Sequence, residues 1–434
     1  MPQMENVLEK LQTLEKSRLT RFVAKLLLVI ITVWILTWPH VRRPESLLLS
    51  GREPYFHLQE GTVAIILSFL NKYTGVDAIL LAKAVPVILG VLCMLLFYGV
   101  LRKVKLNYGI IILSALILII SPSFIYLFGT LNAYAFTSFI FLLALYLFLE
   151  KREVFGIMML YLLPFFGPIS TTLALLLLLI YSLKNKRFRL FLITLPSIAM
   201  IYFLPIRILP SYNNIVISDF GGRYGLGLFT ILLSLFGLKY LWDKKYRHLL
   251  IYLIILSLCL FSLFDVKALA FLNFILVGLA ALGLISLSKE EWKSVLIKQL
   301  TILIMIYGLI FSGLSYINFL SQDLPNQQIL DMVEYLKTAP EGRVFSHGSR
   351  EPWIEYSGKK FVTDENLFYT NKIDQAMATI NSKKIKYLWI DEEMKTKLWN
   401  DEEQGLLFLL EYSKNFRKNK INDYVTLWEV VENP

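Results

Sequence analysis

Long apolar runs alternate with short polar segments over the first three quarters of the chain. An apolar run of about 20 residues is long enough to cross a membrane as a helix. Nine such runs are predicted to be spanning helices: Phe22–Trp38, Ala78–Leu101, Tyr108–Phe128, Ala133–Leu149, Leu190–Ile208, Leu226–Trp242, Leu249–Phe264, Ala268–Leu287 and Val295–Phe319.

A further apolar stretch, Val154–Leu183, is interrupted by Pro and Gly at Pro164–Pro168 and is too long for one straight span. Basic segments flank it on both sides, Glu150–Glu153 before and Lys184–Arg189 after. Because basic loops of membrane proteins face the cytoplasm, the stretch is predicted to enter the membrane and return, as two short helices or a re-entrant hairpin. Such a break is tolerated only against protein or a water-filled cavity. The total becomes about eleven spans.

The same charge rule orients the bundle. Of the 29 Lys and Arg residues in Met1–Leu320, 21 fall in the N-terminal tail, in the turns on the same side as that tail, or in the span ends that adjoin them. The N-terminus is therefore predicted to be cytoplasmic, and the loops Pro39–Asp77 and Pro210–Gly225 to lie outside. The predicted localisation is the cell membrane, with many passes.

From about Ser321 the pattern changes to that of a water-soluble domain. A helix is predicted at Ile329–Leu336, and short strands are predicted between polar helices and turns at Arg343–Ser346, Lys360–Thr363, Tyr387–Ile390 and Val425–Val430. The predicted fold is mainly α: a polytopic membrane helical bundle over residues 1–320, followed by a small extracytoplasmic α/β domain over residues 321–434.

Composition agrees with a membrane protein. Of the 434 residues, 56% are hydrophobic and 18% charged, against roughly 25% charged in soluble domains. The net charge of +11 arises in Met1–Leu320, which has 29 basic and 14 acidic residues. This excess reflects loop bias, so nucleic acid is not expected as a partner. Cys93 and Cys259 both lie in apolar runs and indicate no disulfide framework.

The loop Pro39–Gly61 is the candidate for chemistry, since it holds three acids, two histidines and three arginines. Pro54 suits the first turn of a helix, which is predicted to run to Leu70. Glu53, His57 and Glu60 would then share one face, where a carboxylate beside a histidine could act as a general base or bind a cation. The structural alternative is that Glu53 only favours a helix N-terminus and His57 lies at the water interface.

The residues Gly-Arg-Glu-Pro-Tyr-Phe-His-Leu at Gly51–Leu58 resemble the Asp-Pro-Tyr-Tyr-His-Leu-Arg type motif of oligosaccharyltransferase catalytic subunits. Those subunits belong to the GT-C glycosyltransferases, which use polyprenyl-phosphate-linked sugars as donors. Trp353–Asp364 is similar to the stretch that carries the Trp-Trp-Asp-Tyr-Gly signature of that family. The resemblance implies an inverting membrane glycosyltransferase whose partners are a polyprenyl-phosphate-linked sugar, membrane lipid and an acceptor that the sequence does not identify.

Three departures from the family pattern bear on a metal. Glu53 stands where the family has Asp, Asn132 stands in the turn where oligosaccharyltransferases carry metal-binding acids, and Trp-Trp-Asp is absent around Glu351. The resemblance therefore fits best those GT-C enzymes that use an acid in the first loop and no metal. No metal ligand is assigned, and a divalent cation, Mg²⁺ or Mn²⁺, stays open as a cofactor.

On this interpretation Glu53, with His57 nearby, deprotonates or orients the acceptor. Cations at the outer surface would meet the developing charge on the lipid phosphate, and Arg223, Lys267 and Arg207 are the candidates. Two of them have structural alternatives: Arg207 snorkels to the interface, and Lys267 neutralises Asp265. Arg223 lies in a loop with Gly221, Gly222 and Gly225, which is either mobile enough to close over a donor or only forms turns. The accessory candidates are Glu60, Asp219 and His347, the last of which, with Arg350, faces either the cavity or water.

Two other functions stay open. A transporter or lipid flippase would need charged residues near the midplane and inverted repeats, whereas the ionisable groups here lie at the outer ends of the spans. A non-catalytic membrane scaffold with a GT-C-like fold would account for the missing family acids, because fold likeness alone does not establish activity.

Overall fold

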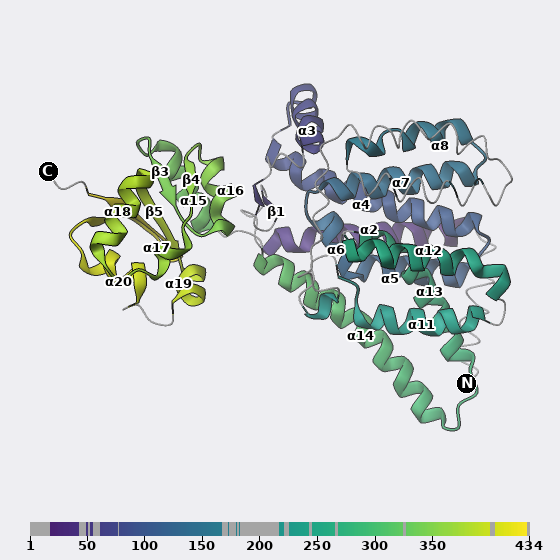
Figure 1. The fold of residues 1–434 in the computed structure, drawn as a ribbon. Coiled ribbons are helices and arrows are strands. Elements are labelled where there is room, and N and C mark those ends of the chain that lie inside the picture. The colour runs from purple at the N-terminus through teal and green to yellow at the C-terminus, as the bar shows by residue number, and fades with distance from the viewer. Residues whose placement is uncertain are drawn as a thin grey trace. The chain divides into compact units, whose positions relative to one another are not determined.

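A computed structural model of the protein describes residues 18–42, 49–50, 53–54, 61–76, 78–166, 172, 179, 182, 217–220, 225–242, 245–264, 268–323, 327–399 and 404–431. The chain forms two compact units (Figure 1). The first comprises Met1–Arg42 and Thr62–Ser321, and the second comprises Arg43–Gly61 and Gln322–Pro434. The loop segment that contains Glu53 thus groups with the C-terminal residues.

The first unit is helical, and its long helices lie side by side (Figure 1). Two 3₁₀ turns, η3 (Leu163–Phe165) and η4 (Ser218–Phe220), accompany the described α-helices. These are α2 (Arg18–Arg42), α3 (Gly61–Thr74), α4 (Ala78–Lys103), α5 (Tyr108–Ile120), α6 (Pro122–Gly129), α7 (Ala133–Leu149), α8 (Glu153–Leu160), α11 (Leu228–Trp242), α12 (Lys245–Phe264), α13 (Leu269–Lys289) and α14 (Val295–Asp323).

Most of the predicted apolar runs in the described part of the chain form helices. Four helices there are long and apolar enough to cross a membrane: Thr20–Trp38, Ala84–Lys103, Leu269–Lys289 and Val295–Asn318. A fifth is reached if the bent pair α5 and α6 forms one span. The predicted span Leu190–Ile208 lies outside the described residues, so a total of about eleven stays a prediction.

The run Tyr108–Phe128 is not one straight helix as predicted. It bends by 61° between α5 and α6, because Pro122 opens α6 at a position where its missing N–H costs nothing. The residue before a proline avoids the helical region, and Ser121 is accordingly extended, with φ −73° and ψ 133°. The Ser121 hydroxyl donates to the carbonyl of Leu118 and so helps to end α5.

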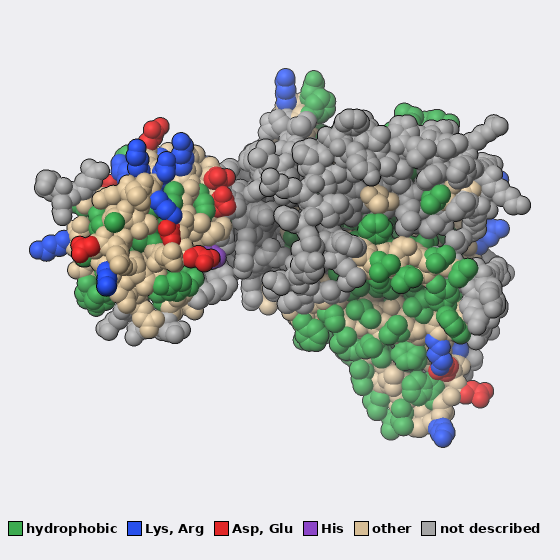
Figure 2. All heavy atoms as spheres, in the orientation of Figure 1, with side chains coloured by type: hydrophobic (Ala, Val, Ile, Leu, Met, Phe, Trp, Pro, Cys, Tyr) green, Lys and Arg blue, Asp and Glu red, His purple; other side chains and the backbone are tan. Residues whose placement is uncertain are grey.

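The first unit exposes a large hydrophobic surface. Figure 2 shows hydrophobic side chains over α11 and α14, with the Lys, Asp and Glu side chains of this region gathered toward one end. Water-soluble monomers rarely expose so much contiguous apolar surface, and lipid is the solvent that suits it. On α14 the exposed hydrophobic residues are Val295, Leu296, Ile297, Leu300, Leu303, Ile304, Ile306, Tyr307, Ile310, Phe311 and Leu314.

Two glycines let α11 and α13 approach closely. A Cβ on Gly283 would lie 1.9 Å from the carbonyl oxygen of Leu233, and a Cβ on Gly237 would lie 2.1 Å from that of Leu279. Both clashes involve backbone, which no side-chain rotation relieves. Small residues at membrane helix contacts allow this kind of packing where the hydrophobic effect between helices is absent.

Gly283→Ala is therefore expected to destabilise the protein by about 1–3 kcal/mol, the usual cost of overpacking a tight contact. Gly278→Ala is the matched control, because it lies on the same helix and its Cβ would meet nothing within 4 Å. Thermal unfolding of the purified protein in detergent should show a lower Tm for Gly283→Ala and an unchanged or slightly raised Tm for Gly278→Ala. Equal Tm values would contradict the close-packing argument.

The second unit is built on a five-stranded sheet of order β4-β3-β5-β7-β6. β3 (Arg343–Phe345) pairs in parallel with β4 (Lys360–Val362) and β5 (Ile385–Asp391), and the remaining pairs, with β7 (Val425–Val430) and β6 (Phe416–Ile421), are antiparallel. The helices are α15 (Gln327–Thr338), α16 (Glu351–Tyr356), α17 (Glu365–Tyr369), α18 (Ile373–Lys383), α19 (Glu392–Leu398) and α20 (Gly405–Tyr412).

The predicted strands all form, and β6 is an addition. Its sequence, with Arg417, Lys418 and Lys420, lacks the apolar alternation that marks a strand. β6 is an edge strand, and charged side chains are common on edges because they discourage pairing with a further chain. The core of the unit is aromatic, with fully buried Phe345, Trp353, Tyr387 and Trp389.

Candidate functional site

Glu53 lies in a short hairpin of the second unit. β1 (Leu49–Ser50) pairs antiparallel with β2 (Glu53–Pro54), Ser50 opposite Glu53. The predicted helix from Pro54 to Leu70 is therefore wrong at its start, since α3 begins at Gly61. Pro54 suits an edge strand as well as a first helical turn, because both positions need no N–H donor. Glu53 consequently does not lie on a helix. The side chain of Glu53, and all of His57 and Glu60, lie outside the described residues.

The hairpin packs against a second segment that the sequence had singled out. β2 lies beside α16, with Cα atoms within 8 Å of each other. On α16, Trp353 and Ile354 are buried in the core while Glu351 and Glu355 are exposed. The buried pair fixes the helix against the sheet and leaves its acids on the outside. The first-loop motif and the Trp353 segment are thus neighbours, although some 300 residues of chain separate them.

His347 comes just before α16 and is exposed. Its ring centroid lies 6.3 Å from that of Phe368, a tilted contact that supports one side of the imidazole. Glu53, His347 and Glu351 belong to the same compact unit. Because Glu351, at the start of α16, is exposed and charged, this segment suits polar ligands better than apolar ones.

Arg350 does not face a cavity. Its Nε donates to Oδ2 of Asp391 at 2.5 Å, and the two side chains are 4% and 0% exposed. The other oxygen of Asp391 accepts the backbone N–H of Met394 at 2.9 Å and so caps α19. The Asp391-Glu-Glu sequence is typical of a solvated helix start, but Asp391 is a buried ion that ties the base of α16 to β5. The sequence signal was present, since Asp391 directly follows the predicted apolar strand Tyr387–Ile390.

Asp219, predicted as an accessory residue, has a structural role. It is exposed in η4, and its Oδ2 accepts the backbone N–H of Leu228 at 2.7 Å. This N–H is one of the free donors at the start of α11, where a carboxylate is also favoured by the helix dipole. Asp219 therefore holds the loop to the helix that follows it.

Gly225 was predicted to lend mobility to this loop, but the structure anchors it. Ile217 and Leu226 form a β-bridge, and the Ser123 hydroxyl donates to the Gly225 carbonyl at 3.1 Å. A Cβ on Gly225 would lie 2.4 Å from the backbone nitrogen of Ser218. Glycine is needed here for close backbone approach. Gly221, Gly222 and the predicted phosphate-binding residues Arg207, Arg223 and Lys267 lie outside the described residues.

Asn132, which stands where the resembled family has metal-binding acids, is a buried helix cap. Its Oδ1 accepts the N–H of Ala135 at 2.9 Å, and its Nδ2 donates to the carbonyl of Leu127 at 2.9 Å. The amide is thus committed to the entry of α7 and does not fit a metal ligand. Within the described ranges, no group of three or more His, Cys, Asp or Glu side chains could hold a metal ion.

Comparison with known proteins gives likeness in structure only. No protein-family model and no curated protein matches the sequence. The oligosaccharyltransferase of Archaeoglobus fulgidus, tethered to an acceptor peptide containing the NVT sequon, matches with a TM-score of 0.53 and 12% identity, over 86% of this chain and 69% of that chain. The same enzyme in complex with Zn and sulfate matches with a TM-score of 0.51 and 13% identity, over 92% and 72%.

A second glycosyltransferase has a comparable fold. Arabinofuranosyltransferase AftD from Mycobacteria matches with a TM-score of 0.54 and 14% identity, over 96% of this chain and 40% of that chain. The chain thus spans about two fifths of the mycobacterial enzyme. Both neighbours are GT-C glycosyltransferases, and the fold of this chain is GT-C-like. The resemblance found in the short first-loop motif is confirmed at the level of fold.

Proposed function

We propose that the protein is a membrane glycosyltransferase that moves a sugar from a polyprenyl-phosphate-linked donor to an acceptor on the outer face of the membrane. The observation that carries the proposal is the packing of the Glu53 hairpin against α16 in a chain with a GT-C-like fold. Contact with α16, which Trp353 and Ile354 anchor in the core, would hold the backbone of Glu53 in the fixed position that general base catalysis needs.

In this proposal Glu53 removes or orients the proton of the acceptor nucleophile. The nucleophile attacks the anomeric carbon in line with the departing lipid phosphate, so the bond to the phosphate oxygen breaks and the configuration inverts. The phosphate gains charge as it leaves, and Arg223, Lys267 and Arg207 are assigned to meet that charge. The predicted topology puts all three on the same outer side as the hairpin.

The proposal assigns no step to a metal. The archaeal neighbour was solved with Zn, and a divalent cation such as Mg²⁺ or Mn²⁺ is the cofactor that such a likeness suggests. Here Asn132 is committed to capping α7. We therefore expect transfer to continue in the presence of EDTA; a loss that Mg²⁺ or Mn²⁺ restores would contradict this assignment.

The test is transfer of radiolabelled sugar from polyprenyl phosphate, in membranes that contain the full chain and in matched membranes without it. The acceptors supplied are a peptide containing an Asn-X-Thr sequence, the glycans of the host membrane, and membrane lipid. Label that moves to one acceptor class only with the chain present supports the proposal and names the acceptor. Labelled donor that crosses the membrane without covalent transfer would instead indicate a transporter. Label that stays on the donor with every sugar supplied would favour the scaffold.

A further inference from the structure

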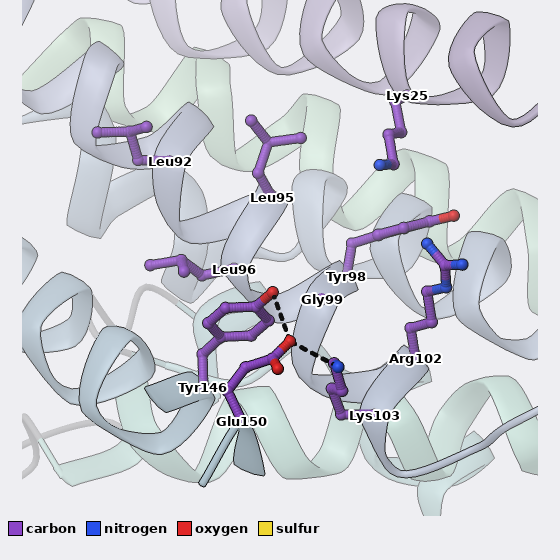
Figure 3. Close-up of a pocket in the computed structure, with 10 residues that line it drawn as sticks. All are labelled: Lys25, Leu92, Leu95, Leu96, Tyr98, Gly99, Arg102, Lys103, Tyr146 and Glu150. Carbon is purple, nitrogen blue, oxygen red and sulfur yellow. Dashed lines mark hydrogen bonds and ion pairs between the residues drawn. The ribbon is translucent and has the colours of Figure 1, made fainter. Parts of the chain in front are cut away.

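A pocket of about 700 Å³ lies in the first unit, far along α4 from its start at Ala78. Figure 3 shows the residues that line it. They come from α2, from the last three turns of α4, and from the end of α7: Lys25, Leu92, Leu95, Leu96, Tyr98, Gly99, Arg102, Lys103, Tyr146 and Glu150. None of them belongs to the proposed transferase site.

One end of this pocket is cationic. Lys103 lies 2.5 Å from Glu150, whose carboxylate also accepts from the Tyr146 hydroxyl at 3.1 Å. These contacts hold the pKa of Glu150 below its ordinary value, with the hydrogen bond from Lys103 as the largest cause. Lys103 and Glu150 therefore neutralise one another. Lys25 and Arg102 carry the remaining positive charge, and among the described residues neither has a carboxylate partner.

The position of Lys25 argues for a ligand. It lies within the apolar span Thr20–Trp38 and is half-buried, with its Nζ 5.3 Å from the centre of the Tyr98 ring. An ionisable side chain inside a spanning segment is costly and in general marks a functional site. In Figure 3, Lys25 and Arg102 reach toward the same tyrosine from opposite sides. Two cations so arranged, with no carboxylate partner among the described residues, suit one anion.

The other wall of the pocket is apolar. Leu92, Leu95 and Leu96 precede Arg102 on α4 by six to ten residues, which corresponds to about 9–15 Å along a helix. Leu92 is 39% exposed on the surface of this membrane unit. A ligand that fills the pocket must therefore combine an anionic end with an apolar stem. A soluble phosphate ion lacks the stem.

We propose that this pocket binds the phosphate headgroup of an anionic membrane lipid. Lys25 and Arg102 donate charge-assisted hydrogen bonds to the phosphate oxygens, and an acyl chain lies along Leu92, Leu95 and Leu96. The predicted topology puts this site in the cytoplasmic leaflet, where anionic lipids favour basic segments. The site is independent of the proposed transfer reaction.

The experiment is native mass spectrometry of the full chain purified in detergent and titrated with dioleoyl phosphatidylglycerol or dioleoyl phosphatidylcholine. The anionic lipid is expected to bind at least tenfold more tightly. Lys25→Met and Arg102→Gln are each expected to weaken its binding about tenfold. The matched control is Lys289→Gln, which removes an exposed basic residue from the end of α13, on the same predicted side. Its affinity should equal that of the wild type.

Three outcomes would overturn the proposal: unchanged binding in both pocket variants, an equal loss in Lys289→Gln, or displacement of the lipid by an equal concentration of glycerol phosphate. The last would identify a site for soluble phosphates. If the charge variants do not fold, Leu95→Trp replaces them, because it fills the apolar wall without changing charge. It should weaken lipid binding, and lipid bound as tightly as by the wild type would equally overturn the proposal.

Discussion

Glu53→Gln is expected to lower the rate of sugar transfer by ~10²–10⁴-fold, the usual cost of removing a general base. The substitution keeps the size of the side chain and removes only its charge and basicity. The hairpin should survive, because β1 and β2 pair through their backbones. The radiolabel assay of the wild type and the variant measures the effect, with kcat and KM determined separately.

Glu365→Gln is the matched control for this experiment. Glu365 is an exposed acid in the first turn of α17, in the same unit. Its substitution by Gln is expected to leave the rate of sugar transfer unchanged. A large loss in kcat confined to Glu53→Gln would support the assignment of the base. Equal rates of sugar transfer by the wild type and Glu53→Gln would still support a glycosyltransferase but would show that Glu53 is not its general base. The acids of α16, Glu351 and Glu355, would then be tested next.

Asp391→Asn is expected to destabilise the second unit by about 3–5 kcal/mol, because it removes the carboxylate charge that pairs with the buried Arg350. Arg350 is 4% exposed and Asp391 is fully buried. Asparagine still accepts the N–H of Met394, so the helix cap is retained and the change isolates the loss of charge. Hydrogen exchange of peptides covering β5 reports the opening free energy of this unit separately from the membrane helices.

Glu429→Gln is the matched control for the ion pair. Arg417 and Glu429 lie 2.9 Å apart in the same sheet, but Arg417 is 70% exposed. Exposed pairs contribute roughly 0–1 kcal/mol, so exchange in this variant should stay close to the wild type. Similar effects in the two variants would show that Asp391 is hydrated despite its burial, and that the pair does not fix α16.

The sequence alone allowed many of the elements to be predicted. An apolar run of about 20 residues crosses lipid as a helix, because a helix satisfies the backbone hydrogen bonds of the segment within the segment itself. Ala133–Leu149 forms a helix with the predicted bounds, and Val425–Val430 forms a strand with the predicted bounds. Local patterns suffice for such elements because period and length are properties of the segment itself.

Where a residue suits two different local structures, the sequence alone could not show which of the two forms. Pro54 is equally acceptable in an edge strand and in a first helical turn, and the chain forms the strand because β1 supplies a partner. Asp391 ends β5 and directly precedes α19, a position that is either solvated or buried. It is buried because Arg350, 41 residues away, neutralises it.

The sequence by itself determined that this is a membrane protein with a helical bundle and a smaller α/β unit. The length of apolar runs, the composition and the hydrophobic period can all be read along the chain without knowing which residues are in contact. It also supplied the short motif that resembles GT-C glycosyltransferases, and the fold of the chain is similar to theirs. Only the tertiary structure decided which distant residues meet: the Glu53 hairpin with α16, Arg350 with Asp391, and Lys25 with Arg102 around Tyr98. Such meetings depend on packing, where the cost of burying a charge is set by its neighbours in space rather than in sequence.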